Sequence, residues 1–516
     1  MAASNSNMRI ARNSVFLTIR MFIVLIITLF TTRLLLKSLG VADYGVYNVV
    51  CGFVSMFAFL NTSMTNGIQR FYNFSLGNKS EFTEAEVFVT SLRIQFLLAI
   101  IIITLTETVG LWYLHNKMVI PEDRFFAAQW IFQLSVISFL LMIIQAPFSA
   151  AIMAHEHMDY YAIVSVLDAV LKLVIAIVLK FFIVDHLIVY GALLLLISVI
   201  NFLFYFAYAR VKFEEIRIVR TKKTALFGSM LSFSGWNIFG SFSGVMKDQG
   251  INLVINYFMG PVVNAAKGVA SQVNGAFQGV VGNLTVAMRP QLIQSYAEGN
   301  VNRTMRLTYS ISKISCCVLY FVSWPVVLEI NYILGLWLDN TVPEHTASFV
   351  IWVLLISFIN SLNSAISGVI HASGRMMAYQ VISSLISSLC VPAAYVALKM
   401  GSEPEIAFVC TLVFSLLAHI AGLFILRTIV HYSIKDYVKK VFIPFFLLVV
   451  LTFALPLIPH HFMSEGVARI LVVFVTSSII IIPIMYYVAL DKDEKKMVSR
   501  FITSLFGRFQ KKSAKE

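Results

Sequence analysis

The chain has 516 residues, of which 59% are hydrophobic and only 13% are charged. Soluble globular domains carry about 25% charged residues, so this composition excludes an ordinary soluble protein and indicates a membrane protein. The formal net charge of +13 lies mainly in loops and in the C-terminal tail, so it does not point to nucleic acid as a partner. Because lipid offers no hydrogen bonds to an unclosed sheet, we expect an all-α membrane protein.

The apolar runs predict the transmembrane helices. A run of about 20 apolar residues crosses the hydrocarbon core, and the sequence holds about fourteen such runs. They are 15–38, 45–67, 88–113, 126–149, 160–183, 187–209, 228–258, 262–287, 307–337, 346–372, 376–399, 404–430, 440–461 and 467–490. Lys and Arg are concentrated in the loops on the side shared by both termini, as in the linker IRIVRTKKTA. Cytoplasmic loops carry the positive excess, so both termini are expected in the cytoplasm.

An internal repeat divides the chain. At a shift of about 220 residues the two halves resemble each other, as in transporters built from parallel repeats. Leu39-Gly40-Val41 corresponds to Met259-Gly260-Pro261, and Arg70-Phe71 corresponds to Arg289-Pro290. We expect an N-terminal six-helix lobe at 1–211, a basic cytoplasmic linker at 212–223, a C-terminal six-helix lobe at 224–433, two further helices at 434–490 and a basic cytoplasmic tail at 491–516.

Ionisable residues inside these helices are the candidate site. Lys247, Asp248 and Lys267 stand in otherwise apolar segments. A charge at the centre of a membrane helix costs about 2.5–3.5 kcal/mol, so such residues face a bundle interior or a watery cavity. Asp248 can neutralise only one of the two lysines, and a purely structural ion pair is the alternative. Arg20 is a further candidate cation. The candidate hydrogen-bonding amides are Asn237, Gln272, Asn274 and Gln278.

Three other charged residues in the predicted helices, Asp168, Lys172 and Glu329, are explained by their positions in the sequence. Asp168 and Lys172 lie four residues apart with the acid first, which favours an ion pair within one helix. That pair is either neutralised in place or part of a cavity in which the acid exchanges protons. Glu329 lies near the outer end of its helix and is expected to be a solvated surface carboxylate.

No motif of enzymatic chemistry is present in the sequence. His155-Glu156-His157 has no third ligand in evidence, so no metal is expected, and the five cysteines stand in apolar runs without a C-x-x-C pair. A Gly-rich phosphate loop, a serine triad and a paired-carboxylate site are all missing. We therefore expect no enzyme and no cofactor. The driving force is then an ion gradient, of protons or sodium ions, or consumption of the substrate.

The N-terminal pattern from Arg12 to Val50 resembles a known family. In it a helix ends in Leu39-Gly40 and is followed by Asp43-Tyr44-Gly45 and Tyr47. This pattern resembles the opening of bacterial polysaccharide and O-antigen flippases, of the multidrug, oligosaccharidyl-lipid and polysaccharide exporter superfamily. Helix count, repeat and basic tail are similar over nearly the whole length. The resemblance implies two six-helix lobes around a central cavity, plus two C-terminal helices.

The resemblance also implies a function. Such flippases move an undecaprenyl-pyrophosphate-linked oligosaccharide across the bacterial cytoplasmic membrane, for example for the O-antigen of lipopolysaccharide. The implied partners are this lipid-linked oligosaccharide, membrane lipids and polysaccharide polymerase or export proteins. The cations suit a pyrophosphate. A cation-coupled multidrug or small-molecule exporter of the same fold is the alternative, and it predicts acids and aromatics in the cavity. A membrane-embedded transferase or polymerase predicts acidic or histidine clusters in long external loops.

The loop charges predict a topology that cysteine labelling can test. In an otherwise cysteine-free protein in intact cells, Lys117→Cys should react with a membrane-impermeant thiol reagent, because its loop is expected outside. Thr221→Cys should be protected until the cells are opened, because the basic linker is expected inside. The reverse pattern would overturn the orientation.

Overall fold

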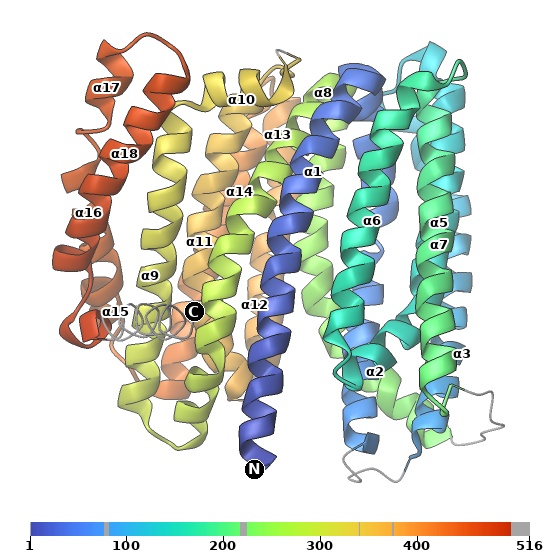
Figure 1. Cartoon of the computed structure of the whole chain (residues 1–516), viewed down its shortest axis with the longest axis horizontal. Coiled ribbons are helices and arrows are strands. Elements are labelled where there is room, and N and C mark those ends of the chain that lie inside the picture. Colours follow the sequence, from blue (N-terminus) through green and yellow to red (C-terminus); the bar gives the residue numbers. More distant parts are fainter. Residues whose placement is uncertain (1, 77–81, 217–223, 340, 374–375, 497–516) are drawn as a thin grey trace, which may run out of the picture. The chain divides into compact units, whose positions relative to one another are not determined.

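The computed structural model describes residues 2–76, 82–216, 224–339, 341–373 and 376–496; the side chains of 2–18 and of several residues in 224–240 and 283–290 lie outside the description. Within these ranges all regular secondary structure is helical (Figure 1). The α-helices are α1 (Ala2–Ser55), α2 (Ala58–Leu76), α3 (Glu84–Leu105), α4 (Leu111–Asn116), α5 (Phe125–Ala154), α6 (Met158–Val178), α7 (His186–Lys212), α8 (Thr224–Ala297), α9 (Val301–Leu328), α10 (Ile330–Leu338), α11 (Thr346–Ala372), α12 (Met376–Ser388), α13 (Cys390–Lys399), α14 (Ile406–Val430), α15 (Ile434–Tyr437), α16 (Ile443–Thr452), α17 (Leu457–Phe462) and α18 (Val467–Ile484).

The all-α membrane fold is confirmed. Among the described residues, 11 helices are long and apolar enough to cross a membrane. Neither α2 nor α8 is among them, although the apolar runs 45–67, 228–258 and 262–287 were expected to cross. The count of about fourteen crossings stays a prediction.

Two glycines break the longest helices. Gly40 in α1 has φ 80° and ψ 167°, and Gly260 in α8 has φ 77° and ψ −174°. Residues with a side chain are strained in this positive-φ region, whereas glycine adopts it readily. Glycine therefore lets the chain leave one helix and enter the next without a longer loop. The two positions are those that the repeat makes equivalent, so the halves share a backbone feature as well as a sequence pattern. The lobe boundaries themselves remain a prediction.

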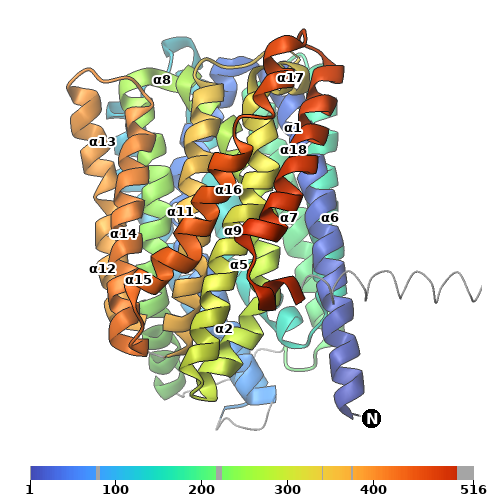
Figure 2. The same ribbon diagram turned by 90° about the vertical axis from the view of Figure 1, so that its left-hand side faces the viewer.

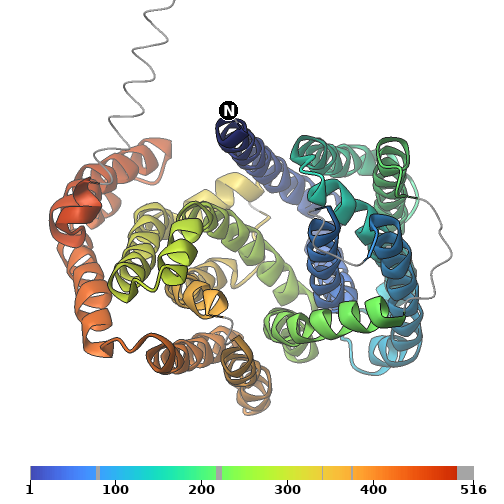
Figure 3. The same ribbon diagram turned by 90° about the horizontal axis from the view of Figure 1, so that it is seen from below.

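The chain divides into two compact units, of which the first is formed by residues 1–273, 337–352 and 380–414. In it α5 packs along α7, α1 packs along α6, and α2 and α3 cover α5 (Figures 1 and 3). Large buried side chains fill contacts between its helices, among them Tyr72, Phe88, Phe148 and Tyr205. An extended set of helix contacts therefore holds this unit together.

The second unit is formed by residues 274–336, 353–379 and 415–516. In it α16 and α18 lie against α9 (Figure 2). Lys313 of α9 binds Glu494 at 2.7 Å, with side chains only 4% and 5% exposed. Removal of one partner of such a buried pair costs about 3–5 kcal/mol, because the other charge stays buried alone. The segment after α18 is thus tied to the middle of α9.

The expectation that Glu329 is a solvated surface carboxylate is wrong. Its side chain is fully buried and accepts hydrogen bonds from Arg469 at 2.7 and 2.9 Å and from His460 at 2.8 Å. The position of Glu329 near a helix end could not predict this burial, because the helices that cover the side chain, α17 and α18, lie far along the chain. The carboxylate is stabilised by its arginine partner, in charge-assisted hydrogen bonds.

The glycine breaks generate a prediction. Gly40→Ala and Gly260→Ala should each destabilise the protein by about 1–3 kcal/mol, since alanine is strained at these angles. Steric crowding is not the cause: a Cβ at Gly40 would meet nothing within 4 Å, and one at Gly260 would meet only Val119, at 3.8 Å. Thermal unfolding in detergent should show a lower midpoint for both variants. Gly244→Ala is the control, because Gly244 is helical and also has open space. A midpoint equal to that of the control would contradict the prediction.

Candidate functional site

The two segments of α8 on either side of Gly260 are joined by polar side chains. Asn264 donates its amide to the backbone carbonyl of Asn252 at 2.9 Å and to its side-chain oxygen at 2.7 Å. Further from the break, Lys267 Nζ donates to Asp248 Oδ1 at 3.1 Å. Because both contacts cross the break, the chain runs back alongside itself after Gly260. This hairpin brings together two of the ionisable residues that the sequence singled out.

The Lys267–Asp248 pair is asymmetric. The lysine side chain is only 8% exposed, whereas that of the aspartate is 57% exposed. A buried ammonium group needs an anionic partner, and here the partner keeps most of its hydration. Lys247 directly precedes Asp248 in α8 and is a second, half-buried cation. Its titratable neighbours include Cys390 and Asp248. The three side chains together carry one excess positive charge.

The segment of α1 that follows Gly40 packs closely on this hairpin. A Cβ at Gly268 would lie 2.7 Å from the amide nitrogen of Asn48, and one at Gly45 would collide with the backbone of Pro261. Asn252 in turn donates to the carbonyl of Asn48 at 3.2 Å. Small residues permit such close approach, and amides then bond across it.

The motif Asp43-Tyr44-Gly45 acquires a physical role in this packing. Asp43 binds Arg124, which also binds Asp185 at 2.7 Å, so the start of the second segment is tied to α5 and to the N-terminus of α7. Tyr44 is buried. The motif thus positions the helix that contacts Lys267's segment.

The sequence analysis missed two buried amides. Asn252 and Asn256 are 5% and 1% exposed. Asn256 accepts from the backbone nitrogen of Val119 at 2.9 Å and donates to its carbonyl at 3.2 Å. A spacing of four residues puts both on one helical face, and this was the signal available in the sequence. They serve helix packing, since their hydrogen bonds go to the protein.

Arg20 of α1 lies beside a different polar cluster, which is formed by side chains of α6 and α7. Its guanidinium donates to Ser165 at 3.3 Å and lies 5.1 Å from the ring centre of Tyr161. One helical turn further along α6, Lys172 binds Asp168 at 2.7 Å. Asp168 also accepts from Asn201 of α7 at 2.7 Å. The pair that spacing predicted is formed, with an amide as an additional partner.

The remaining candidate residues are dispersed. Gln272 is half-buried in the first unit. In the second unit Asn274 accepts from Ser357 at 2.5 Å. Gln278 is half-buried, and its amide nitrogen has no hydrogen-bond partner among the described residues. The side chain of Asn237 lies outside the described residues, as does the basic tail after residue 496.

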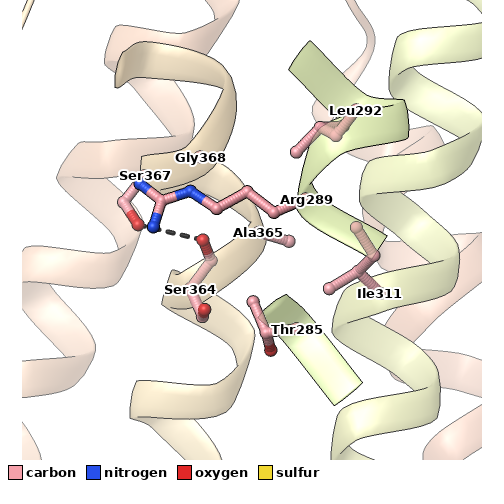
Figure 4. A pocket seen from close by; sticks show the side chains of 8 residues that line it. All are labelled: Thr285, Arg289, Leu292, Ile311, Ser364, Ala365, Ser367 and Gly368. Atoms are coloured by element: carbon pink, nitrogen blue, oxygen red, sulfur yellow. Dashed lines mark hydrogen bonds between the residues drawn. The ribbon is translucent and has the colours of Figure 1, made fainter. Parts of the chain in front are cut away.

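A small pocket of about 60 Å³ lies in the second unit, between the end of α8 and α11 (Figure 4). Thr285 and Arg289 line it from α8, and Ser364, Ser367 and Gly368 line it from α11. The arginine side chain extends across the pocket toward the two serines. The sequence analysis named Arg289 only as part of the repeat.

Comparison with known proteins identifies the fold. No family model matches the sequence, and no curated protein matches it. The structure is similar to "Lipid II flippase MurJ, inward closed conformation", with a TM-score of 0.66, 13% identity and coverage of 91% of this chain and 97% of that one. It is also similar to the "Inward-facing conformation of a multidrug resistance MATE family transporter of the MOP superfamily", with a TM-score of 0.63, 14% identity and coverage of 82% and 99%. The chain therefore has the fold of these transporters.

The asparagine contact generates a prediction. Asn264→Ala should lower the thermal midpoint of the purified protein, because the side-chain oxygen of buried Asn252 loses its donor at a cost of about 1–3 kcal/mol. Asn116→Ala is the control, since Asn116 is exposed and, among the described residues, its side chain bonds only to the preceding turn, at Trp112. Equal midpoints for the two variants would show that the hairpin does not depend on this bond.

Proposed function

We propose that this protein is a flippase that moves a lipid-linked, pyrophosphate-bearing oligosaccharide across the cytoplasmic membrane, as a member of the superfamily that contains MurJ and the MATE transporters. The observation that carries this proposal is the buried Lys267, held by a half-exposed Asp248 beside Lys247. Lys267 and Lys247 bring two cations to one carboxylate in this hairpin, so the formal charge of the three side chains together is positive. A pyrophosphate group is the kind of substrate that such a charge attracts.

The proposed mechanism is alternating access with an exchange of partners at Lys267. In the absence of substrate, Asp248 neutralises the ammonium group. When a phosphate arrives, the aspartate can leave at little cost, since most of its surface is already solvated. Removal of a fully buried partner would cost several kcal/mol more. Asymmetric burial thus lets a resting ion pair serve as a binding site.

The similarity to the MurJ structure supports a lipid-linked substrate, and its coverage of 91% of this chain exceeds the 82% covered by the MATE structure. The MATE similarity supports the alternative, a cation-coupled exporter of drugs or other small molecules. For such an exporter the Asp168–Lys172 pair would be the candidate for coupling to protons. Unchanged drug tolerance in a host that overproduces the protein, together with loss of surface polysaccharide in a deletion strain, would favour the flippase.

A double substitution separates substrate binding from structure. Lys267→Ala alone should reduce export with little loss of protein level, because the half-exposed Asp248 stays hydrated without its partner. Lys267→Ala combined with Asp248→Asn removes both charges and should also keep the protein level. We expect export from the double variant to stay about ten- to a hundred-fold below wild type, since a charged hydrogen bond contributes about 1.5–3 kcal/mol. Surface polysaccharide and membrane protein level are measured in the same cells.

The control is the pair Lys172→Ala and Asp168→Asn, introduced together. It removes an ion pair of similar length from α6 without touching the α8 hairpin. Wild-type export from the Lys267 and Asp248 double variant would show that the pair is structural only and would refute the proposed site.

A further inference from the structure

The pocket between α8 and α11 contains a cation without an acidic neighbour. No acidic side chain lines it, and within the described residues Arg289 forms no ion pair. The guanidinium instead reaches toward Ser364 and Ser367 across the cavity (Figure 4). Arginine offers a planar fork of donors that matches two oxygens of one oxyanion. The guanidinium of Arg289 is therefore suited to bind an anionic ligand in this pocket.

The hydroxyl groups narrow the class of anion. Ser367 donates to the carbonyl of Ser364 at 2.9 Å, and Thr285 donates to that of Val281 at 3.3 Å. Because both hydroxyl protons are already used in these hydrogen bonds, the hydroxyl oxygens of Ser367 and Thr285 can only accept further hydrogen bonds. An ionised carboxylate can only accept, whereas a phosphate with a pKa near 6 is partly protonated and can also donate. The lining thus favours a phosphate over a carboxylate.

The size of the pocket agrees with this assignment. A volume of about 60 Å³ exceeds the roughly 10–15 Å³ that one water needs, so the cavity has room for a small anion. The absence of a side chain at Gly368 leaves space in the pocket, since a Cβ there would lie 3.1 Å from the side chain of Leu292. The loop charges place this end of α8 on the expected cytoplasmic side.

We propose that the pocket between α8 and α11 is a binding site for a phosphate group, with Arg289 as its anchor and the Ser364 hydroxyl as a second donor. The phosphate is carried by a lipid headgroup or is free in solution; both present the same oxygens. The site lies in the second unit and shares no residue with the Lys267–Asp248 pair. The proposal therefore does not depend on what the protein transports.

The test measures ligand-induced thermal stabilisation of the full-length protein in nanodiscs of zwitterionic lipid. The probes are inorganic phosphate, undecaprenyl phosphate and methyl glucuronate. Arg289→Gln should weaken phosphate binding about ten-fold or more, and Arg289→Lys should weaken it less, because charge is kept and the fork is lost. Ser364→Ala should weaken it about three-fold, as loss of one neutral donor does.

Arg303→Gln is the matched control, since Arg303 is a half-exposed arginine paired with Glu298 outside the pocket. It should bind the probes as wild type does. Undecaprenyl phosphate that binds much more tightly than inorganic phosphate, with loss in Arg289→Gln, identifies a lipid headgroup; equal, Arg289-dependent affinities identify free phosphate. Affinity unchanged in Arg289→Gln would overturn the site. Should that variant fail to fold, Ser364→Ala and Arg289→Lys with unchanged affinity would overturn it equally. Glucuronate binding as tight as phosphate would overturn the phosphate assignment.

Discussion

Charged and amide side chains inside apolar helices must find partners within the protein, and both units are organised by this requirement. Water is absent from the hydrocarbon core, so an unpaired polar group there costs several kcal/mol. In the first unit the α8 hairpin meets the requirement through Lys267 with Asp248 and Asn264 with Asn252. In the second, Lys313 with Glu494 and Arg469 with Glu329 do so.

These ion pairs differ in how deeply their two partners are buried. Lys313 and Glu494 are both buried, as are Arg469 and Glu329, so neither partner can leave cheaply. Such pairs hold the last helices against α9. In the Lys267 pair only the cation is buried, and our proposed mechanism uses this difference: the carboxylate moves into water while a phosphate takes its place. The pairs of the second unit thus hold helices together, whereas the Lys267 pair of the first unit is proposed to exchange its partner.

Glycine makes the hairpin possible. Gly260 turns the chain back without a loop, and the small residues at Gly45 and Gly268 let the neighbouring segment of α1 come close enough for asparagines to bond between helices. The polar network therefore depends on backbone positions that carry no side chain. Helix packing in a membrane relies on such close contact, because lipid gives no hydrophobic force between helices.

The sequence by itself determined the all-α membrane fold, because composition and run length leave no other way to satisfy the backbone in lipid. It also located Gly40 and Gly260 through the repeat, and Asp168 with Lys172, because these features depend on local spacing alone. Only the tertiary structure decided that Lys267 meets Asp248, that Arg20 of α1 contacts α6, and that Glu329 is buried under α17 and α18. Spacing along the chain cannot give these contacts, because each depends on how separate helices are turned toward one another. The pocket at Arg289 has the same origin, since its lining comes from α8 and α11, which only packing brings together.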